Sequence, residues 1–172
     1  GTHKHRIRRF SLQSKVVLMT SAVLIVLPAL YFFFFEYDHE TIHDRTIHSL
    51  FQSVTTRTAG FNTTDLAAMD ESGTAIMIIL MLIGGSPGST AGGMKTATFA
   101  VLFLSAITVL SRRNDVQCFK RRISDEAVRS AGAVLFMYLV SFFTSGIIIS
   151  RVENLPLLTC LFETSSAIGT VG

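Results

Sequence analysis

The sequence Gly-Gly-Ser-Pro-Gly-Ser-Thr-Ala-Gly-Gly at residues 84–93 interrupts an apolar segment that runs from about residue 74 to residue 110. In a helix interior each glycine costs about 1 kcal/mol relative to alanine, and a proline costs about 3 kcal/mol. A continuous helix through this stretch is therefore strongly disfavoured. The sequence predicts two half-helices joined by a loop.

Two further apolar runs lie on either side of the interrupted segment. Residues 16–35 and 130–150 contain no charged side chain. A helix of about 20 apolar residues is long enough to cross the hydrocarbon core of a bilayer, whereas a buried core helix of a soluble protein is usually shorter. Each span must also bond its own backbone groups, which favours helices. The sequence therefore predicts an all-α membrane protein whose middle crossing is broken.

The charged residues indicate the orientation of these crossings. Residues 1–15 contain only basic charges, residues 36–71 are mostly acidic, and residues 111–129 are again mostly basic. Because basic flanks remain in the cytoplasm, we expect the N-terminus and the 111–126 loop inside and residues 36–71 outside. The basic loop can contact membrane lipid. A nucleic-acid partner is not expected, because no known module or aromatic interleaving accompanies the basic residues.

Two short segments form an internal repeat. The sequences SLFQSVTTRTAGF at 49–61 and TCLFETSSAIGTVG at 159–172 share a Leu-Phe-[Gln/Glu] motif and a Thr-[Ala/Val]-Gly end. When the two Thr-x-Gly triplets are aligned, the Leu-Phe pairs differ by one residue of spacing. Each copy follows a span on its outer side, and the helices expected at 46–56 and 156–167 are too short to cross a membrane. The pattern predicts membrane-helix, pore-helix, membrane-helix repeats with re-entrant loops, and an ordinary extracellular loop is the alternative.

The chemistry of the two Thr-x-Gly segments suits potassium. A potassium filter replaces the hydration shell of the ion with backbone carbonyls, and glycine tolerates the backbone angles that this requires. The second segment has the form of the first three residues of the channel filter TVGYG, and the first is a degenerate version. The candidate filter residues are Thr58, Ala59, Gly60, Phe61, Asn62, Thr170, Val171 and Gly172.

The glycine-rich break is a candidate gate. Irregular backbone at membrane depth is tolerated where it lines a cavity, and this one keeps polar side chains. The candidate gate loop consists of Gly84, Gly85, Ser86, Pro87, Gly88, Ser89, Thr90, Ala91, Gly92 and Gly93. A phosphate-binding loop is a poor alternative at 88–96, because Met94 places Lys95 one position late and no βαβ unit surrounds it.

Two basic residues lie beside these segments. Lys95 falls within a membrane span, where an ionisable group is either functional or snorkels toward the interface, so a role in gating and snorkelling both remain open. Arg57 belongs to the first Thr-x-Gly turn. It can order the filter by bonding to backbone carbonyls, or it can pair with an acidic residue outside.

Three motifs together resemble the Trk/Ktr/HKT superfamily of potassium transporters. They are TTRTAGFNT at 55–63, IGGSPGSTAGGMKT at 83–96 and FETSSAIGTVG at 162–172. The Ser-Pro-Gly form is more similar to the bacterial Ktr membrane subunit than to the Trk type. The resemblance implies four repeats around one pore in each subunit of a homodimer. It makes residues 1–110 the third repeat, 111–126 a cytoplasmic connecting loop, and 127–172 the start of the fourth, so the chain is expected to be a fragment.

The resemblance also implies a function without covalent chemistry. It indicates potassium uptake across the plasma membrane, as a channel or as a symporter, with K+ as the transported ion and Na+ as a coupling or activating ion. The implied cytosolic partner is a nucleotide-binding regulatory ring, and the basic loop faces its side of the membrane. Gly60 favours potassium, because serine there accompanies sodium permeation in plant members.

The alternative function is a membrane-embedded sensor or enzyme component. It needs a set of reactive groups within the membrane, and Lys95 is the only ionisable group inside the expected spans. Cys118 and Cys160 lie far apart in the sequence and have no metal-ligand spacing. We therefore expect no enzyme, no cofactor and no metal other than potassium at the filter.

Overall fold

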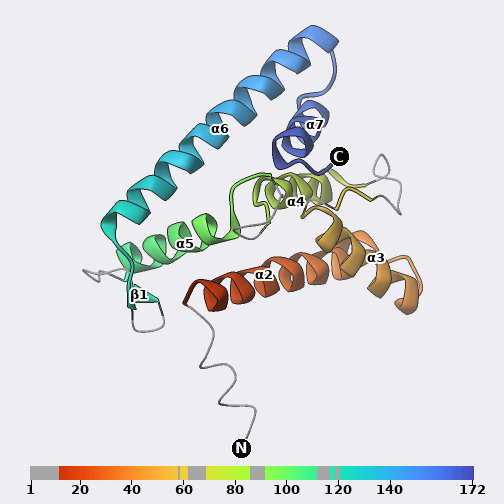
Figure 1. The fold of residues 1–172 in the computed structure, drawn as a ribbon. Helices are drawn as coiled ribbons and strands as arrows, with labels where there is room; N and C mark the ends of the chain where they lie inside the picture. Colours follow the sequence, from red (N-terminus) through yellow and green to blue (C-terminus); the bar gives the residue numbers. More distant parts are fainter. Residues whose placement is uncertain (1–11, 58, 62–68, 86–91, 112–116, 119–120) are drawn as a thin grey trace, which may run out of the picture.

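The fold is almost entirely helical in the computed structural model, which describes residues 12–57, 59–61, 69–85, 92–111, 117–118 and 121–172 (Figure 1). The strands in this described part are β1 (Gln117–Cys118) and β2 (Arg121–Arg122), which pair antiparallel in the connecting loop. The prediction of a helical fold is confirmed. The small β-ladder was not predicted, because two-residue strands are too short to show an alternating apolar pattern.

The first span ends in a π-helical turn. Helix α2 (Leu12–Tyr31) continues directly into η1 (Phe32–Glu36), and the backbone N–H of Tyr37 closes the turn on the carbonyl of Phe32 at 3.0 Å. The chain then reverses into α3 (Ile42–Thr55), the first candidate pore helix. Its N-cap residue is Thr41, whose hydroxyl accepts a hydrogen bond from the backbone of Asp44. Such a cap satisfies one of the unpaired donors at a helix start.

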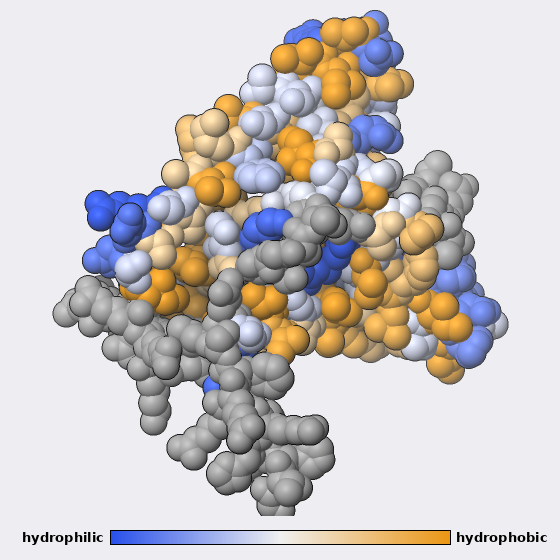
Figure 2. Space-filling view, in the orientation of Figure 1, coloured by the Kyte–Doolittle hydropathy of each residue, from blue (hydrophilic) through white to orange (hydrophobic). Residues whose placement is uncertain are grey.

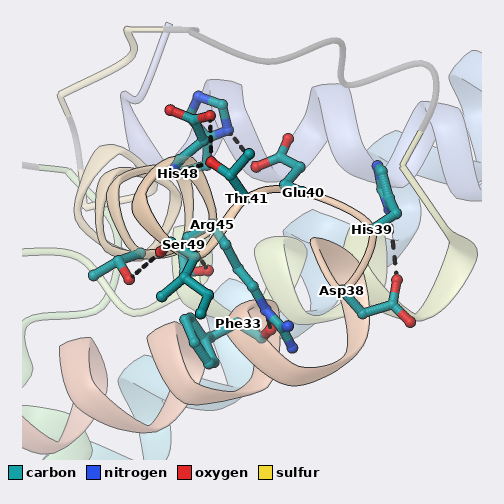
Figure 3. Close-up of polar contacts among 11 residues, drawn as sticks. Phe33, Asp38, His39, Glu40, Thr41, Arg45, His48 and Ser49 are labelled. Atoms are coloured by element: carbon teal, nitrogen blue, oxygen red, sulfur yellow. Dashed lines mark hydrogen bonds and ion pairs between the residues drawn. The ribbon is translucent and has the colours of Figure 1, made fainter.

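A polar cluster fixes the angle between α2 and α3 (Figure 3). His48 Nδ1 lies 2.7 Å from Glu40 Oε2 across the reversal. The guanidinium of Arg45 donates from Nε to the carbonyl of Phe33 and lies 4.3 Å from the centre of the Phe33 ring. The pore helix therefore bonds to the irregular turn that precedes it, and its direction is set at its N-terminal end.

The glycine-rich break predicted from the sequence separates two helices. Helix α4 (Glu71–Leu82) precedes it and α5 (Thr96–Leu110) follows it. The start of α4 is tied to the end of the first span, because the backbone N–H of Asp70 donates to Glu36 Oε1 at 2.9 Å. A carboxylate in this position also complements the positive end of the helix dipole.

The second unit begins with a long helix. Helix α6 (Asp125–Glu153) starts at its N-cap Ser124 and ends at Asn154, which has a left-handed backbone conformation. Helix α7 (Leu157–Gly169), the second candidate pore helix, folds back beside the end of α6 (Figure 1). The order of a long apolar helix and a short helix thus occurs twice.

The helices converge on one buried centre. Helix α2 packs against α3 and α5, while α7 packs against α4 and α6 (Figure 1). A cluster of buried apolar side chains lies where the first span, α4, the two ends of the glycine-rich segment and the end of the chain meet. It consists of Leu24, Phe32, Tyr37, Met77, Leu80, Met81, Ile83, Met94 and Val171.

Much of the outer surface is apolar. Residues Ser14–Glu36 and Asp125–Glu153 form helices that are long and apolar enough to cross a membrane, and most of each remains unburied within the chain. Figure 2 shows apolar side chains spread over this face of the molecule. On α6 the exposed residues include Phe136, Val140 and Ile148. Apolar patches of this extent mark contact with lipid or with other protein segments.

A charge on the exposed face of α6 is expected to reduce its insertion into membranes. Val140 lies near the middle of the helix and is 46% exposed. A lysine at the centre of a membrane helix costs about 2.5–3.5 kcal/mol in insertion assays, so Val140→Lys should lower the inserted fraction measured by glycosylation mapping. The matched control is Glu126→Lys in the first turn. Equal insertion of both variants would contradict a membrane-facing α6.

Candidate functional site

The two predicted filter segments lie against each other. A Cβ atom added to Gly60 would collide with the carbonyl group of Val171, so the backbones of the two turns are in direct contact. Gly60 has φ +71° and Gly172 has φ +107°, a left-handed region that favours glycine. The structure therefore brings Ala59, Gly60 and Phe61 together with the C-terminal triplet. Thr58 and Asn62 lie outside the described residues.

Each turn receives the same side-chain hydrogen bond from its own pore helix. Thr55 Oγ1 donates to the carbonyl of Phe61 at 2.5 Å. Ser166 Oγ donates to the carbonyl of Gly172 at 3.2 Å. The two bonds have the same sequence separation of 6 residues. Each hydroxyl thereby orients a carbonyl of its candidate filter segment. This role of Thr55 and Ser166 was not predicted from the sequence.

The backbone bonds define the register of the repeat. The N–H of Gly60 donates to the carbonyl of Thr55, and the N–H of Val171 donates to the carbonyl of Ser166. By these bonds Gly60 is equivalent to Val171, whereas alignment of the two Thr-x-Gly triplets would make Gly60 equivalent to Gly172. The equivalence in the structure is the one obtained when the two Leu-Phe pairs are aligned. The candidate pore helix determines the register of the turn that follows it, because carbonyls in its last turn accept the hydrogen bonds of that turn.

A pocket of about 210 Å³ lies between the two turns. Its lining includes Gln52 and Glu163, the equivalent residues of the Leu-Phe-[Gln/Glu] motif, one from each pore helix. Gln52 is buried, and its amide lies 3.0 Å from Met77 Sδ. Glu163 is exposed and also borders a second pocket beside Thr170. The shared motif was the sequence signal for this pair, although it gave no indication that both would face one pocket.

The two ends of the glycine-rich segment are joined by backbone hydrogen bonds. We call residues 82–85 and 92–96 together the neck. The N–H of Gly84 donates to the carbonyl of Met94, and the N–H of Met94 donates to the carbonyl of Leu82, both at 2.9 Å. The neck is therefore a short parallel pairing that closes the break between α4 and α5.

Two positions of the neck require glycine. A Cβ atom on Gly84 would collide with the carbonyl of Gly92, and Gly93 has φ +72°. Of the candidate gate loop, the structure describes Gly84, Gly85, Gly92 and Gly93. The other members, residues 86–91, lie outside the described residues.

Arg57 connects the first filter turn to the neck. Its guanidinium donates to Thr96 Oγ1 at 3.0 Å, to the carbonyl of Gly84 at 3.4 Å and to the carbonyl of Ser21 in α2 at 3.5 Å. Of the two interpretations left open by the sequence, bonding to backbone carbonyls matches the structure. The acceptors belong to the neck and to α2 and not to the filter itself.

Lys95 is the N-cap residue of α5 and is half-buried. A cation at a helix N-terminus faces the positive end of the helix dipole, which is unfavourable. Stabilisation of α5 therefore does not explain this lysine. Its role in gating stays a prediction. In the described part of the chain, no group of three His, Cys, Asp or Glu side chains is arranged to hold a metal ion.

Comparison with known families decides the class of protein. Residues 2–172 match the model of the TrkH family, described as a cation transport protein. The chain belongs to the TrkH family. It is 36% identical to Ktr system potassium uptake protein B and 34% identical to Ktr system potassium uptake protein D of Bacillus subtilis, over 97% and 98% of the chain. It is 33% identical to potassium/sodium uptake protein NtpJ of Enterococcus hirae over 98% of the chain.

These matches confirm the resemblance drawn from the three motifs. The TrkH family is a family of cation transport proteins and not of enzymes, so the alternative of an enzyme component is set aside. It spans 38–39% of the length of these curated relatives. Functions of the complete relatives therefore come to this chain as proposals.

The contact between the two turns predicts a position-specific cost of adding one methyl group. Gly60→Ala places a Cβ against the carbonyl of Val171 and forces an unfavourable φ, so we expect rubidium uptake by the full-length transporter to fall at least about tenfold. Gly132→Ala is the matched control, because a Cβ there meets nothing within 4 Å. Normal uptake by Gly60→Ala would contradict the backbone contact.

Proposed function

We propose that this chain is the third repeat and the start of the fourth in a potassium-uptake subunit of the plasma membrane. Residues 1–110 form the third repeat, 111–126 the cytoplasmic connection, and 127–172 the first span, pore helix and filter of the fourth repeat. The order of α2, α3 and the broken α4–α5 pair supports this division. The order of α6 and α7 repeats the order of α2 and α3 in the first unit.

One observation carries the proposal. The Thr-x-Gly turns are far apart in the sequence, yet they pack backbone to backbone, and each has a carbonyl held by a hydroxyl of its own pore helix. Paired turns of this kind suit a filter in which carbonyl oxygens replace the water around an ion. In the proposed four-repeat subunit, two further turns complete the ring.

The transported ion is proposed to be K+. Gly60 places no side chain against the carbonyl of Val171, and several relatives are named as potassium uptake proteins. Na+ is a second candidate as a coupling or activating ion, because one relative is named a potassium/sodium uptake protein. Channel and symport mechanisms both fit this filter.

The central part of the glycine-rich segment is proposed to be an intramembrane gate. Ser86, Ser89 and Thr90 make it polar, and the neck fixes both of its ends. Lys95, which lies two residues after Gly93, is proposed to influence the gate.

The proposed assembly is a homodimer in membrane lipid with a cytosolic nucleotide-binding ring. The basic residues of the 111–126 loop support a cytoplasmic location for this loop by the positive-inside rule. It is therefore the proposed contact with the ring. Relatives named as parts of a Ktr system support a subunit that works with partners.

Rubidium uptake by the full-length subunit tests the transport function. Cells that lack other potassium uptake and express the wild-type protein should accumulate rubidium and should discriminate against sodium. Gly60→Ser should reduce that discrimination, because an added side chain disturbs the carbonyl ring. Wild-type protein that reaches the membrane without increasing rubidium uptake would contradict the proposal.

Shortening the segment tests the gate separately. Deletion of two or three residues within 86–91, with the neck retained, should raise the uptake rate and leave the rubidium-to-sodium ratio unchanged. The control is a deletion of the same size within residues 64–68, which precede α4 and contain no candidate filter residue. An unchanged uptake rate in the 86–91 deletion would count against a gate at this position.

A further inference from the structure

We propose that the neck braces both filter turns and that Tyr138 of α6 is a positioning residue for ion selectivity. This inference rests on the proposed transport function and extends it. It assigns to the ends of the glycine-rich segment a role distinct from gating. The contacts that carry it involve the neck, the two pore-helix turns and one side chain of α6.

The neck is bonded to the fourth-repeat turn at two points. The backbone N–H of Gly92 donates to Thr170 Oγ1 at 2.7 Å, and the N–H of Gly93 donates to the carbonyl of Ile168 at 3.2 Å. The fit is tight, because a Cβ on Gly92 would lie 2.5 Å from Thr170 Oγ1 and 2.6 Å from its Cγ2. A small movement of this end of the neck must therefore move Thr170.

The conformation of Thr170 depends on such support. Its φ of 53° places a β-branched residue in the left-handed region, where L-residues with a branched Cβ are rare. A backbone in this region persists when the surrounding contacts determine it. The hydrogen bond from Gly92 fixes the side chain, and the N–H of Thr170 bonds to the carbonyl of Ala167. The neck thus helps to hold the first residue of the candidate Thr-Val-Gly filter.

The neck is also bonded to the third-repeat turn. Arg57, which lies directly before the first Thr-x-Gly segment, donates to Gly84 and to Thr96. The hydroxyl of Thr96 is buried and donates to the carbonyl of Gly84 at 3.1 Å. A charged donor strengthens these bonds. One short backbone pairing therefore contacts both turns, from opposite ends of the glycine-rich segment.

Tyr138 anchors the neck to the long helix α6. Its hydroxyl donates to the carbonyl of Gly93 at 3.1 Å, and the side chain is half-buried. On a helix with so many exposed apolar residues, a tyrosine hydroxyl requires a polar partner. Gly93 accepts from Tyr138 and donates to Ile168, so α6, the neck and the fourth-repeat turn are linked through one residue.

A brace and a gate make different predictions for transport. A gate controls how often the path is open, so its alteration changes flux for every permeant ion alike. A brace controls the spacing of the filter carbonyls, which decides between potassium and sodium. Loss of the Tyr138 hydroxyl should therefore change selectivity, although it removes no atom from the filter or from the glycine-rich segment.

The test compares Tyr138→Phe with Tyr31→Phe in the full-length transporter. Tyr31 is a matched control, because its ring stacks on Phe35 at 5.2 Å near the end of the first span. Loss of one net hydrogen bond changes an equilibrium about two- to tenfold. We expect the rubidium-to-sodium uptake ratio to fall by about this factor in Tyr138→Phe, with equal membrane levels and with Tyr31→Phe at the wild-type ratio.

Two results would contradict the proposed support of the filter turns by the neck. One is a wild-type rubidium-to-sodium uptake ratio in Tyr138→Phe. The other is a changed rubidium uptake rate with an unchanged rubidium-to-sodium ratio, which indicates an effect on gating alone. An inactive wild-type protein would instead contradict the proposed function. In that case amide hydrogen exchange at Gly93 decides: faster exchange in Tyr138→Phe than in Tyr31→Phe supports the brace, and equal exchange overturns it.

Discussion

The structure depends on the need to bond the backbone groups of three helix breaks that lie within a bundle of apolar helices. An unpaired N–H or C=O that is buried away from water is costly. The chain leaves helical geometry after α3, after α7 and between α4 and α5. These three breaks bond to one another and to neighbouring side chains such as Arg57 and Tyr138. Each irregular segment thereby supplies the hydrogen-bonding partners that another segment needs.

Close approach of backbones makes this arrangement possible, and glycine makes the approach possible. Gly60 allows the two filter turns to touch, and Gly84 allows the two ends of the neck to pair. Gly169 has a similar role, since a Cβ there would lie 2.5 Å from the carbonyl of Met81 in α4. Small residues also favour close helix packing in membranes, where burial of apolar surface gives little driving force. The glycines therefore determine which segments meet.

The sequence was sufficient to predict the main helices, but not the π-helical turn, the small β-ladder or the contacts between elements. Run lengths predicted the spans, and the cost of glycine and proline predicted the break between α4 and α5. The hydropathy pattern does not indicate which backbone carbonyl accepts a hydrogen bond from a given side-chain hydroxyl. For this reason the bond from Thr55 to Phe61, the role of Tyr138 and the one-residue difference in repeat register were missed. The repeat of Leu-Phe-[Gln/Glu] showed equivalence between the pore helices but not their shared pocket.

In the proposed transporter, the glycine-rich segment combines two mechanical requirements in one short sequence. A movable gate needs a segment with few constraints, whereas a selective filter needs rigid support. The neck is proposed to supply the support, because its paired ends bond to Thr170 and Arg57. Tyr138 extends the support to α6, which belongs to the following repeat. Contacts between repeats, rather than the filter residues alone, would then set the spacing on which ion selection depends.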